Sequence, residues 1–150
     1  MSIFEQFTKG QMDAQEMLNR NFAAVEAQLA NKANVGTLEW HDLALTEGLK
    51  KYSTCQYCRT QEQIGIIQIA AETEEGADAI AAGTRIAVLP EGFRPHGRVP
   101  LPATFESRTS LVRAAGVLIL HPNGDIVLGA AADTAVYAIY CSNVFNVPGK

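Results

Sequence analysis

The chain has 150 residues and a mass of 16.2 kDa, a size typical of one ordinary domain with or without a small appendage. Apolar residues make up 47% of the chain and charged residues 19%, so it can bury a core and does not belong to the disordered class. Sixteen acidic residues against twelve basic ones leave a net charge of -4, which argues against a protein that mainly neutralises nucleic-acid phosphates.

The N-terminal sequence and the cysteines predict synthesis in a reducing cytoplasm. The first fifteen residues lack the basic start and apolar stretch of a secretory signal, and no run approaches the ~18 apolar residues that span a bilayer. Cys55 and Cys58 have the spacing of a zinc-binding pair, but Cys141 stands alone and strand alternation would point the first two to opposite faces. The acidic run over 72–78 lacks the fixed glycine and alternating ligands of a calcium loop. We expect no metal, no cofactor and no insertion into a membrane.

A helix is predicted over residues 11–32, where Pro and Gly are absent. Apolar residues return there in steps of three or four and form one narrow stripe, which comprises Ala14, Leu18, Phe22, Val25 and Leu29. Mixed three and four spacing is typical of the seam of a coiled coil between chains, and the alternative is a helix packed on its own domain. Phe4 and Phe7 are large apolar residues for a chain terminus, and we interpret them as an anchor on another surface.

Residues 34–37 are predicted to form a hinge, after which the sequence takes on strand character. The expected strands cover 37–44, 51–59, 64–71, 84–89, 98–102, 110–120, 125–128 and 134–145. Their short spacing, without a second helix long enough for a crossover, predicts an antiparallel β-sandwich or barrel. The expected domains are a helical segment over 1–35 and a β head over 36–150.

Two turns are predicted from their residue types. His121-Pro-Asn-Gly124 separates two apolar runs, and Asn-Gly favours the positive φ values of a tight hairpin. Leu89-Pro-Glu-Gly92 places Pro at the second and Gly at the fourth position of a type I turn, while Pro95 favours an extended Arg94.

Enzymatic activity is not expected from the residue pattern. His41, Asp42 and His96 have the chemistry of general bases, but no serine lies in a glycine-flanked elbow that would make it a nucleophile. A glycine loop that would hold a phosphate is also missing from the sequence. The chain is therefore predicted to bind rather than to catalyse.

Ligand binding has more support. Four basic residues between Arg85 and Arg113 are opposed only by Glu91 and Glu106, and they are Arg94, His96, Arg98 and Arg108. Guanidinium forks match the carboxylates or phosphates of a polymer, although a solvated rim or a contact between subunits would use the same residues. Trp40 beside His41 and Asp42 combines a ring with polar groups, as sugar-binding sites do; its alternative role is in the core of the β domain.

These features together resemble the small receptor-binding proteins in the tail baseplates of phages that infect Gram-positive bacteria, such as lactococcal siphophages. The stretch over 7–26, Phe-Thr-Lys-Gly-Gln-Met-Asp and onward, is similar to the helical segment that trimerises and plugs into the baseplate in that family. The run over 84–95 with Leu-Pro-Glu-Gly-Phe-Arg-Pro, followed by the hairpin over 116–128, is similar to their head domains. The resemblance implies a homotrimer with β-barrel heads on the virion tail, made in the host cytoplasm and bound to host cell-wall polysaccharide.

The saccharide site of the lactococcal relatives is not carried over. It uses His, Asp and Trp around the equivalent hairpin, whereas the matching positions here read Val-Leu-Ile-Leu over 117–120 and Ile-Val-Leu over 126–128, which suits a core or a threefold interface. The saccharide-binding residues are instead expected to be Trp40, Asp42, Arg94, His96 and Arg98. The helix stripe is the expected trimer seam, and Phe4 and Phe7 are expected to dock on a baseplate protein. The alternatives are a structural tail-tip or decoration trimer without a ligand, and then a polysaccharide depolymerase.

Overall fold

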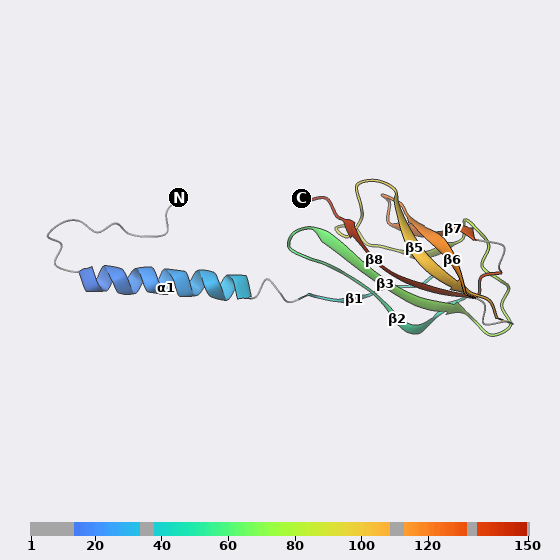
Figure 1. Cartoon of the computed structure of the whole chain (residues 1–150), viewed down its shortest axis with the longest axis horizontal. Coiled ribbons are helices and arrows are strands. Elements are labelled where there is room, and N and C mark those ends of the chain that lie inside the picture. Colours follow the sequence, from blue (N-terminus) through green and yellow to red (C-terminus); the bar gives the residue numbers. More distant parts are fainter. Residues whose placement is uncertain (1–13, 34–37, 109–112, 132–134, 150) are drawn as a thin grey trace. The chain divides into compact units, whose positions relative to one another are not determined.

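A computed structural model describes residues 14–33, 38–108, 113–131 and 135–149 (Figure 1). Contacts divide the chain into two units, Met1–Thr37 and Leu38–Lys150. The first unit contains the helix, and the second is a β head that contains the strands. The predicted anchor residues Phe4 and Phe7 and the predicted hinge over 34–37 lie outside the described residues.

The helix, α1, runs over Ala14–Ala33 and agrees with the prediction within the described range. Its residues are good helix formers without Pro or Gly, and Glu16 in the first turn favours the positive end of the helix dipole. The predicted apolar stripe is largely exposed, with Leu18 at 44%, Phe22 at 60% and Leu29 at 60% of full exposure. Ala14 is exposed as well, and Val25 is half-buried.

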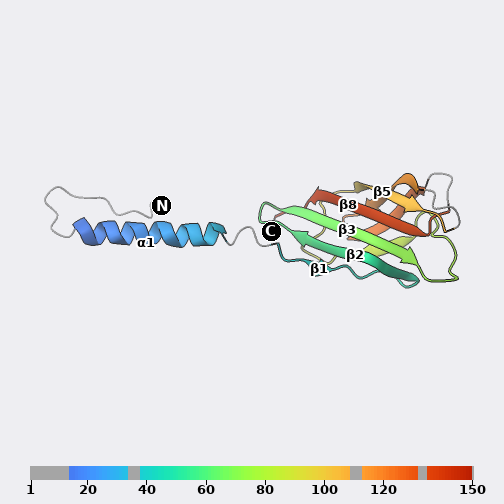
Figure 2. The ribbon, with the colours of Figure 1, turned by 60° about the horizontal axis from the view of Figure 1, so that its bottom comes forward.

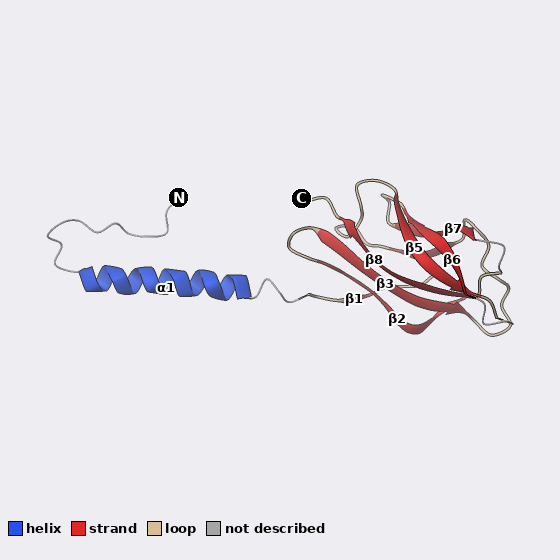
Figure 3. Cartoon of the chain, in the orientation of Figure 1, coloured by secondary structure: helices blue, strands red, loops and turns tan. Residues whose placement is uncertain are grey.

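The head is one antiparallel sheet of eight strands (Figure 3). The strands are β1 (His41–Asp42), β2 (Leu49–Arg59), β3 (Ile64–Thr73), β4 (Arg85–Val88), β5 (Val99–Glu106), β6 (Arg113–Leu120), β7 (Asp125–Ala131) and β8 (Ala138–Asn146). Their order across the sheet is β1-β2-β3-β8-β5-β6-β7-β4, and each pair is antiparallel. The prediction of an antiparallel β head is confirmed.

Strands β2, β3, β8 and β5 lie side by side in the curled sheet (Figure 2). The curl brings the two edges of the sheet together. Leu45, just after β1, forms an antiparallel bridge with Ala87 of β4, and the Thr46 amide donates to the Ile86 carbonyl at 2.8 Å. Residues in β3 alternate between buried and more exposed positions, as expected for a strand with one face on a core. The fully buried residues include Ile67, Phe105, Leu118, Leu120, Ile126, Leu128 and Ile139.

The apolar hairpin of β6 and β7 supplies part of this core. Leu118, Leu120 and Ile126 are completely buried, so the core interpretation of these positions is confirmed. Gly116 lies against the ring of Phe105, where a Cβ atom would overlap the ring carbons. The bulky Phe105 therefore occupies the space that the missing side chain leaves.

Several strand bounds differ from the prediction. Strand β7 continues to Ala131 and β8 begins only at Ala138. The predicted strand over 37–44 is reduced to β1, because the chain leaves β2 after Leu43 and bridges to β4 at Leu45. The strand predicted to end at Pro102 continues to Glu106. Pro100 and Pro102 lie where β5 pairs with β6 alone, so their missing amide hydrogens interrupt no ladder, and β8 joins only at 104–106.

Both predicted turns exist with a shifted geometry. In the β6–β7 hairpin the Gly124 amide donates to the His121 carbonyl at 2.9 Å, and Gly124 alone of the four residues has a positive φ, +94°. The second turn closes one residue later than predicted, since the Phe93 amide donates to the Pro90 carbonyl at 3.2 Å. Gly92 is thus its third residue, and a φ of +92° at that position is typical of type II rather than type I.

The barrel-like head has two ends, which we call proximal and distal. The chain runs into β1 from the proximal end, which also contains the turn over 60–63, the segment over 89–98 and the turn over 121–124. The distal end contains the segments over 74–84, 107–108 and 135–137. Both ends contain polar hollows.

Candidate functional site

The proximal end contains a hollow of about 340 Å³ beside the segment through which the chain enters. It is lined by Glu39, His41, Arg59, Glu91, Gly92 and Phe93. Strand β1 brings His41 next to Tyr57 because the two residues are register partners on β1 and β2. The segment after β4 then contributes Phe93 from the opposite edge of the sheet.

The aromatic side chains of this hollow pack on one another. The His41 ring stacks on Tyr57 with centroids 5.4 Å apart and meets Phe93 edge-on at 5.2 Å, while Tyr57 and Phe93 are 4.8 Å apart. Arg59 Nη1 donates to the Gly92 carbonyl at 2.8 Å. Burial raises the pKa of the Tyr57 hydroxyl. Contacts within the protein therefore already occupy much of the ring surface of this hollow and one N–H donor of Arg59.

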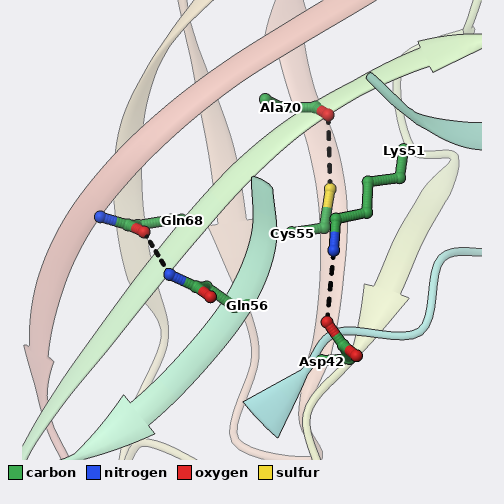
Figure 4. A network of polar contacts seen from close by, with 6 residues as sticks. All are labelled: Asp42, Lys51, Cys55, Gln56, Gln68 and Ala70. Atoms are coloured by element: carbon green, nitrogen blue, oxygen red, sulfur yellow. Dashed lines mark hydrogen bonds and ion pairs between the residues drawn. The ribbon is translucent and has the colours of Figure 1, made fainter. Parts of the chain in front are cut away.

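The structure places the five sequence-predicted saccharide residues near the proximal end without gathering them in one hollow. Trp40 is 38% exposed and adjoins His41. Asp42 is 91% exposed and pairs with Lys51 at 3.3 Å (Figure 4). His96 and Arg98 are exposed in the segment before β5.

Arg94, the fifth of these residues, braces two turns. Its Nε donates to the Leu89 carbonyl at 2.9 Å and lies against Gly124. It also lines a hollow of about 360 Å³, together with Glu91, Gly92, Pro95, Pro122, Val147 and Pro148.

The basic residues over 85–113 do not form one surface. Arg85 pairs with Asp125 at 3.7 Å, and Arg113 pairs with Glu106 at 3.4 Å. Arg108 lies near the distal end, whereas Arg94 is proximal. The strands between these residues carry them to different ends of the head, so a single arginine cluster is not present among the described residues.

The distal end contains a hollow of about 210 Å³ that sequence reasoning missed. Three tyrosines line it, namely Tyr52 of β2, Tyr140 of β8 and Tyr137, which directly precedes β8. The remaining lining residues are Glu72, Thr73, Glu106, Ser107, Arg108 and Ala138. The only sequence signal was the close spacing of two tyrosines at 137 and 140, because the other residues come from distant strands.

The tyrosines and Arg108 form the walls of the distal hollow. Tyr52 meets Tyr140 edge-on with ring centroids 6.1 Å apart and planes at 88°. The Arg108 guanidinium lies 4.4 Å from the centre of the Tyr137 ring. Its Nη2 donates to the Thr73 hydroxyl at 3.0 Å and to the carbonyls of Glu74 and Ala77 at 3.2 and 3.0 Å.

Two carboxylates complete this distal hollow. Glu72 pairs with Lys50 at 3.1 Å through Oε1, and Glu106 pairs with Arg113 at 3.4 Å through Oε2. The side chain of Glu106 is only 16% exposed. Burial raises the pKa of the Tyr140 hydroxyl, and the negative charge of Glu106 raises it further. The Tyr140 hydroxyl therefore keeps its proton and remains a hydrogen-bond donor at neutral pH.

The other features of the head include a hollow without charged side chains and three buried cysteines. A hollow of about 480 Å³ on the face of β2, β3 and β8 is lined by small, amide and apolar residues and by Tyr140, with no charged side chain. Next to it, Gln56 donates to Gln68 at 2.8 Å (Figure 4). Cys55, Cys58 and Cys141 are free and buried, and burial raises the pKa of each thiol.

The described part of the chain contains neither a cluster of metal ligands nor a helix that could span a membrane. Among the described residues, no group of three His, Cys, Asp or Glu side chains is placed to share one metal ion. Helix α1, within the described part of the chain, does not have the length and hydropathy of a membrane span.

Two solved structures with a similar fold come from phage receptor-binding proteins. The receptor-binding protein gp15 of Listeria phage PSA matches with a TM-score of 0.68 and 11% identity, over 96% of this chain and 89% of that chain. The head domain of lactococcal phage bIL170 matches with a TM-score of 0.55 and 15% identity, over 75% of this chain and 100% of that chain. No protein-family profile and no curated protein sequence matches the chain. The predicted resemblance to phage receptor-binding proteins is confirmed at the level of the fold.

Proposed function

We propose that the chain is a receptor-binding protein of a phage tail baseplate, which attaches the virion to a saccharide on the host surface without catalysing a reaction. The observation that carries this proposal is the match of nearly the whole chain to the receptor-binding protein of Listeria phage PSA. The head alone is also similar to the head domain of a lactococcal phage. Fold does not by itself define function, so the proposal depends on the tests below.

The exposed stripe of α1 supports assembly into a homotrimer. Leu18, Phe22 and Leu29 are each at least 44% exposed, although they lie on one face at coiled-coil spacing. Burying such side chains between chains is favourable by about 1.5–3 kcal/mol for each fully buried one. Three copies packed along this stripe would cover it, and the segment before the helix, with Phe4 and Phe7, would dock on a baseplate protein.

The mass in solution tests the trimer. Light scattering should give about three times the 16.2 kDa of one chain. Phe22→Asp should lower the mass, because it places a charge in the seam, whereas Ala27→Asp on the opposite, exposed helix face should not. A monomeric wild-type protein would contradict the trimer.

Weak binding by each head would suffice for attachment. A contact with one sugar is expected to be weak, but several linked heads raise the effective concentration and multiply the avidity by about 10²–10⁴. Within the head, the distal hollow lies at the end away from the segment through which the chain enters β1.

Cell binding tests the function directly. The full chain fused to a fluorescent protein should bind particular bacterial strains, and purified wall polysaccharide from those strains should compete. Binding to no strain would favour the alternative of a structural tail-tip trimer without a ligand. Release of reducing ends from the polysaccharide would instead indicate a depolymerase.

A further inference from the structure

Three of the four tyrosines of the chain meet in the distal hollow, although aromatic residues make up only 7% of the sequence. The fourth, Tyr57, is packed against His41 and Phe93 at the proximal end. Tyr52 is 61% exposed, and its one aromatic neighbour is Tyr140. A tyrosine presents an apolar ring and a polar tip, so this wall offers both kinds of contact to a bound molecule.

The hydrogen-bonding groups of the hollow are complementary. Glu72 and Glu106 each use one oxygen for an ion pair at the rim and keep the second as an acceptor. No hydrogen bond within the described part of the chain engages the hydroxyl of Tyr52 or Tyr140. All three hydrogen bonds of Arg108 come from Nη2, which leaves its other N–H groups as donors. Acceptors and donors thus surround one small space.

The size and charge of the hollow restrict its ligand. At about 210 Å³ it is smaller than the ~300–1,000 Å³ pockets that bury drug-sized molecules, and one sugar ring is a suitable occupant. Lys50 and Arg113 neutralise the two carboxylates, so a cationic ligand has little charge to gain. A phosphate group, whose ionised oxygens only accept hydrogen bonds, would leave the free oxygens of Glu72 and Glu106 without a donor, whereas a sugar hydroxyl can donate to them.

We propose that the distal hollow binds one neutral sugar ring of the host polysaccharide, a proposal that rests on the proposed function. Tyr52 forms the platform for the C–H face of the ring. Glu72 and Glu106 accept hydrogen bonds from its hydroxyl groups, while Tyr140 and Arg108 donate to its oxygen atoms. Arg108 is held in place by Tyr137 and the Thr73–Ala77 segment, which fixes one wall before the ligand arrives.

The test uses the full chain and three variants. Tyr52→Ala removes the platform, Glu106→Gln removes a charged acceptor at constant shape, and Glu62→Gln is the matched charge removal in the exposed β2–β3 turn. Binding of glucose, galactose, mannose and N-acetylglucosamine is measured by ligand-observed NMR, and adhesion is measured on the cells that bind the wild-type fusion. Unfolding temperatures verify that each variant is folded.

We expect Tyr52→Ala and Glu106→Gln each to weaken sugar binding and adhesion about tenfold or more, because each removes a contact that the ligand needs, and Glu62→Gln to match wild type. If wild-type protein adheres but both pocket variants adhere equally well, the distal site is wrong while the proposed function stands. Adhesion of wild type to no cells removes the proposed function and this site with it. Competition by a glycerol-phosphate polymer but by no neutral sugar overturns the ligand class. Should Tyr52→Ala fail to fold, the isosteric Glu106→Gln decides.

Discussion

Both ends of the head contain a hollow, but the aromatic and basic side chains at the proximal end pack closely on one another, whereas those at the distal end leave more ring surface and more hydrogen-bonding groups unused. His41, Tyr57 and Phe93 pack ring to ring, and Arg59 is committed to the Gly92 carbonyl. Tyr52, by contrast, touches another ring at only one edge and is mostly exposed. Similar residue types therefore stabilise turns at one end and remain available for binding at the other.

The difference follows from how each end is connected. At the proximal end irregular segments and turns meet, and side-chain donors such as Arg94 satisfy the backbone carbonyls there. At the distal end the donor is Arg108, which anchors one wall, while Glu72 and Glu106 pair only with cations at the rim. A cluster of charged and aromatic residues therefore becomes a binding site only where contacts within the protein leave some of its hydrogen-bonding groups and ring surface unused.

The largest expected effect comes from comparing a glycine at each end. Gly124 at the proximal end and Gly76 at the distal end have φ values of +94° and +81°. A Cβ on Gly124 would overlap the Leu89 carbonyl oxygen and lie 2.7 Å from Arg94 Nε, whereas one on Gly76 would meet nothing within 4 Å. Gly124→Ala should lower the free energy of unfolding by about 3 kcal/mol and Gly76→Ala by about 1 kcal/mol.

Urea unfolding of the two glycine variants measures the difference. Equal losses would mean that only backbone strain matters and that the proximal end is no more tightly packed than the distal one. A larger loss for Gly76→Ala would reverse the comparison.

The next-largest expected effect is a loss of stability on replacing one of two arginines from the predicted saccharide site. Arg94 donates to a backbone carbonyl in a half-buried position, so Arg94→Ala should cost about 1–2 kcal/mol of unfolding free energy. Arg98 is exposed, and Arg98→Ala should change stability by less than about 0.5 kcal/mol. Thermal unfolding followed by circular dichroism checks both. An Arg94→Ala protein as stable as wild type would free Arg94 for a role in binding alone.

The elements were predictable because their signals are local. The stripe of α1 and the alternation in β3 appear within a few residues of sequence, and the strands found in the head each have an expected counterpart. The register of the turn after β4 was wrong because Gly is favoured at the third position of a type II turn and at the fourth position of a type I turn. The sequence alone does not distinguish these two placements of Gly92. The extent of β5 was wrong because tolerance of Pro102 depends on which neighbour β5 has there.

The distal hollow was not predictable from sequence. Tyr52, Glu106 and Tyr140 lie on β2, β5 and β8. These strands are far apart in the sequence but close in the sheet, where β2, β3, β8 and β5 are consecutive. The sequence instead predicted Trp40 and Asp42, because an aromatic ring and polar groups follow one another there as they do in sugar-binding sites. Composition within a few residues therefore indicated a binding protein but could not locate a site assembled across four strands.

Adhesion measurements can show which end of the head contributes more to cell binding. Tyr52→Ala should weaken cell adhesion about tenfold, which corresponds to about 1.4 kcal/mol, and more than Trp40→Ala does. Both variants remove an exposed aromatic side chain, so they are matched in kind. The opposite ranking would favour the proximal residues Trp40, Asp42 and His96 as the saccharide site and would overturn the comparison of the two ends.

The smallest expected effect is a shift in the titration of one tyrosine. Tyr57 and Tyr140 both have a pKa above the ordinary value near 10, Tyr57 because of burial and Tyr140 because of burial and then the charge of Glu106. Glu106→Gln should therefore lower the pKa of Tyr140 and leave that of Tyr57 unchanged, as read from ring signals of labelled tyrosine in NMR spectra against pH. Since the folded-state pKa values are raised, the neutral hydroxyls stabilise the fold fully below about pH 10, and this stabilisation is lost as the pH rises through the folded-state values. Equal titration of Tyr140 in both proteins would mean that Glu106 does not act on the hydroxyl, and the two groups would then not share one binding hollow.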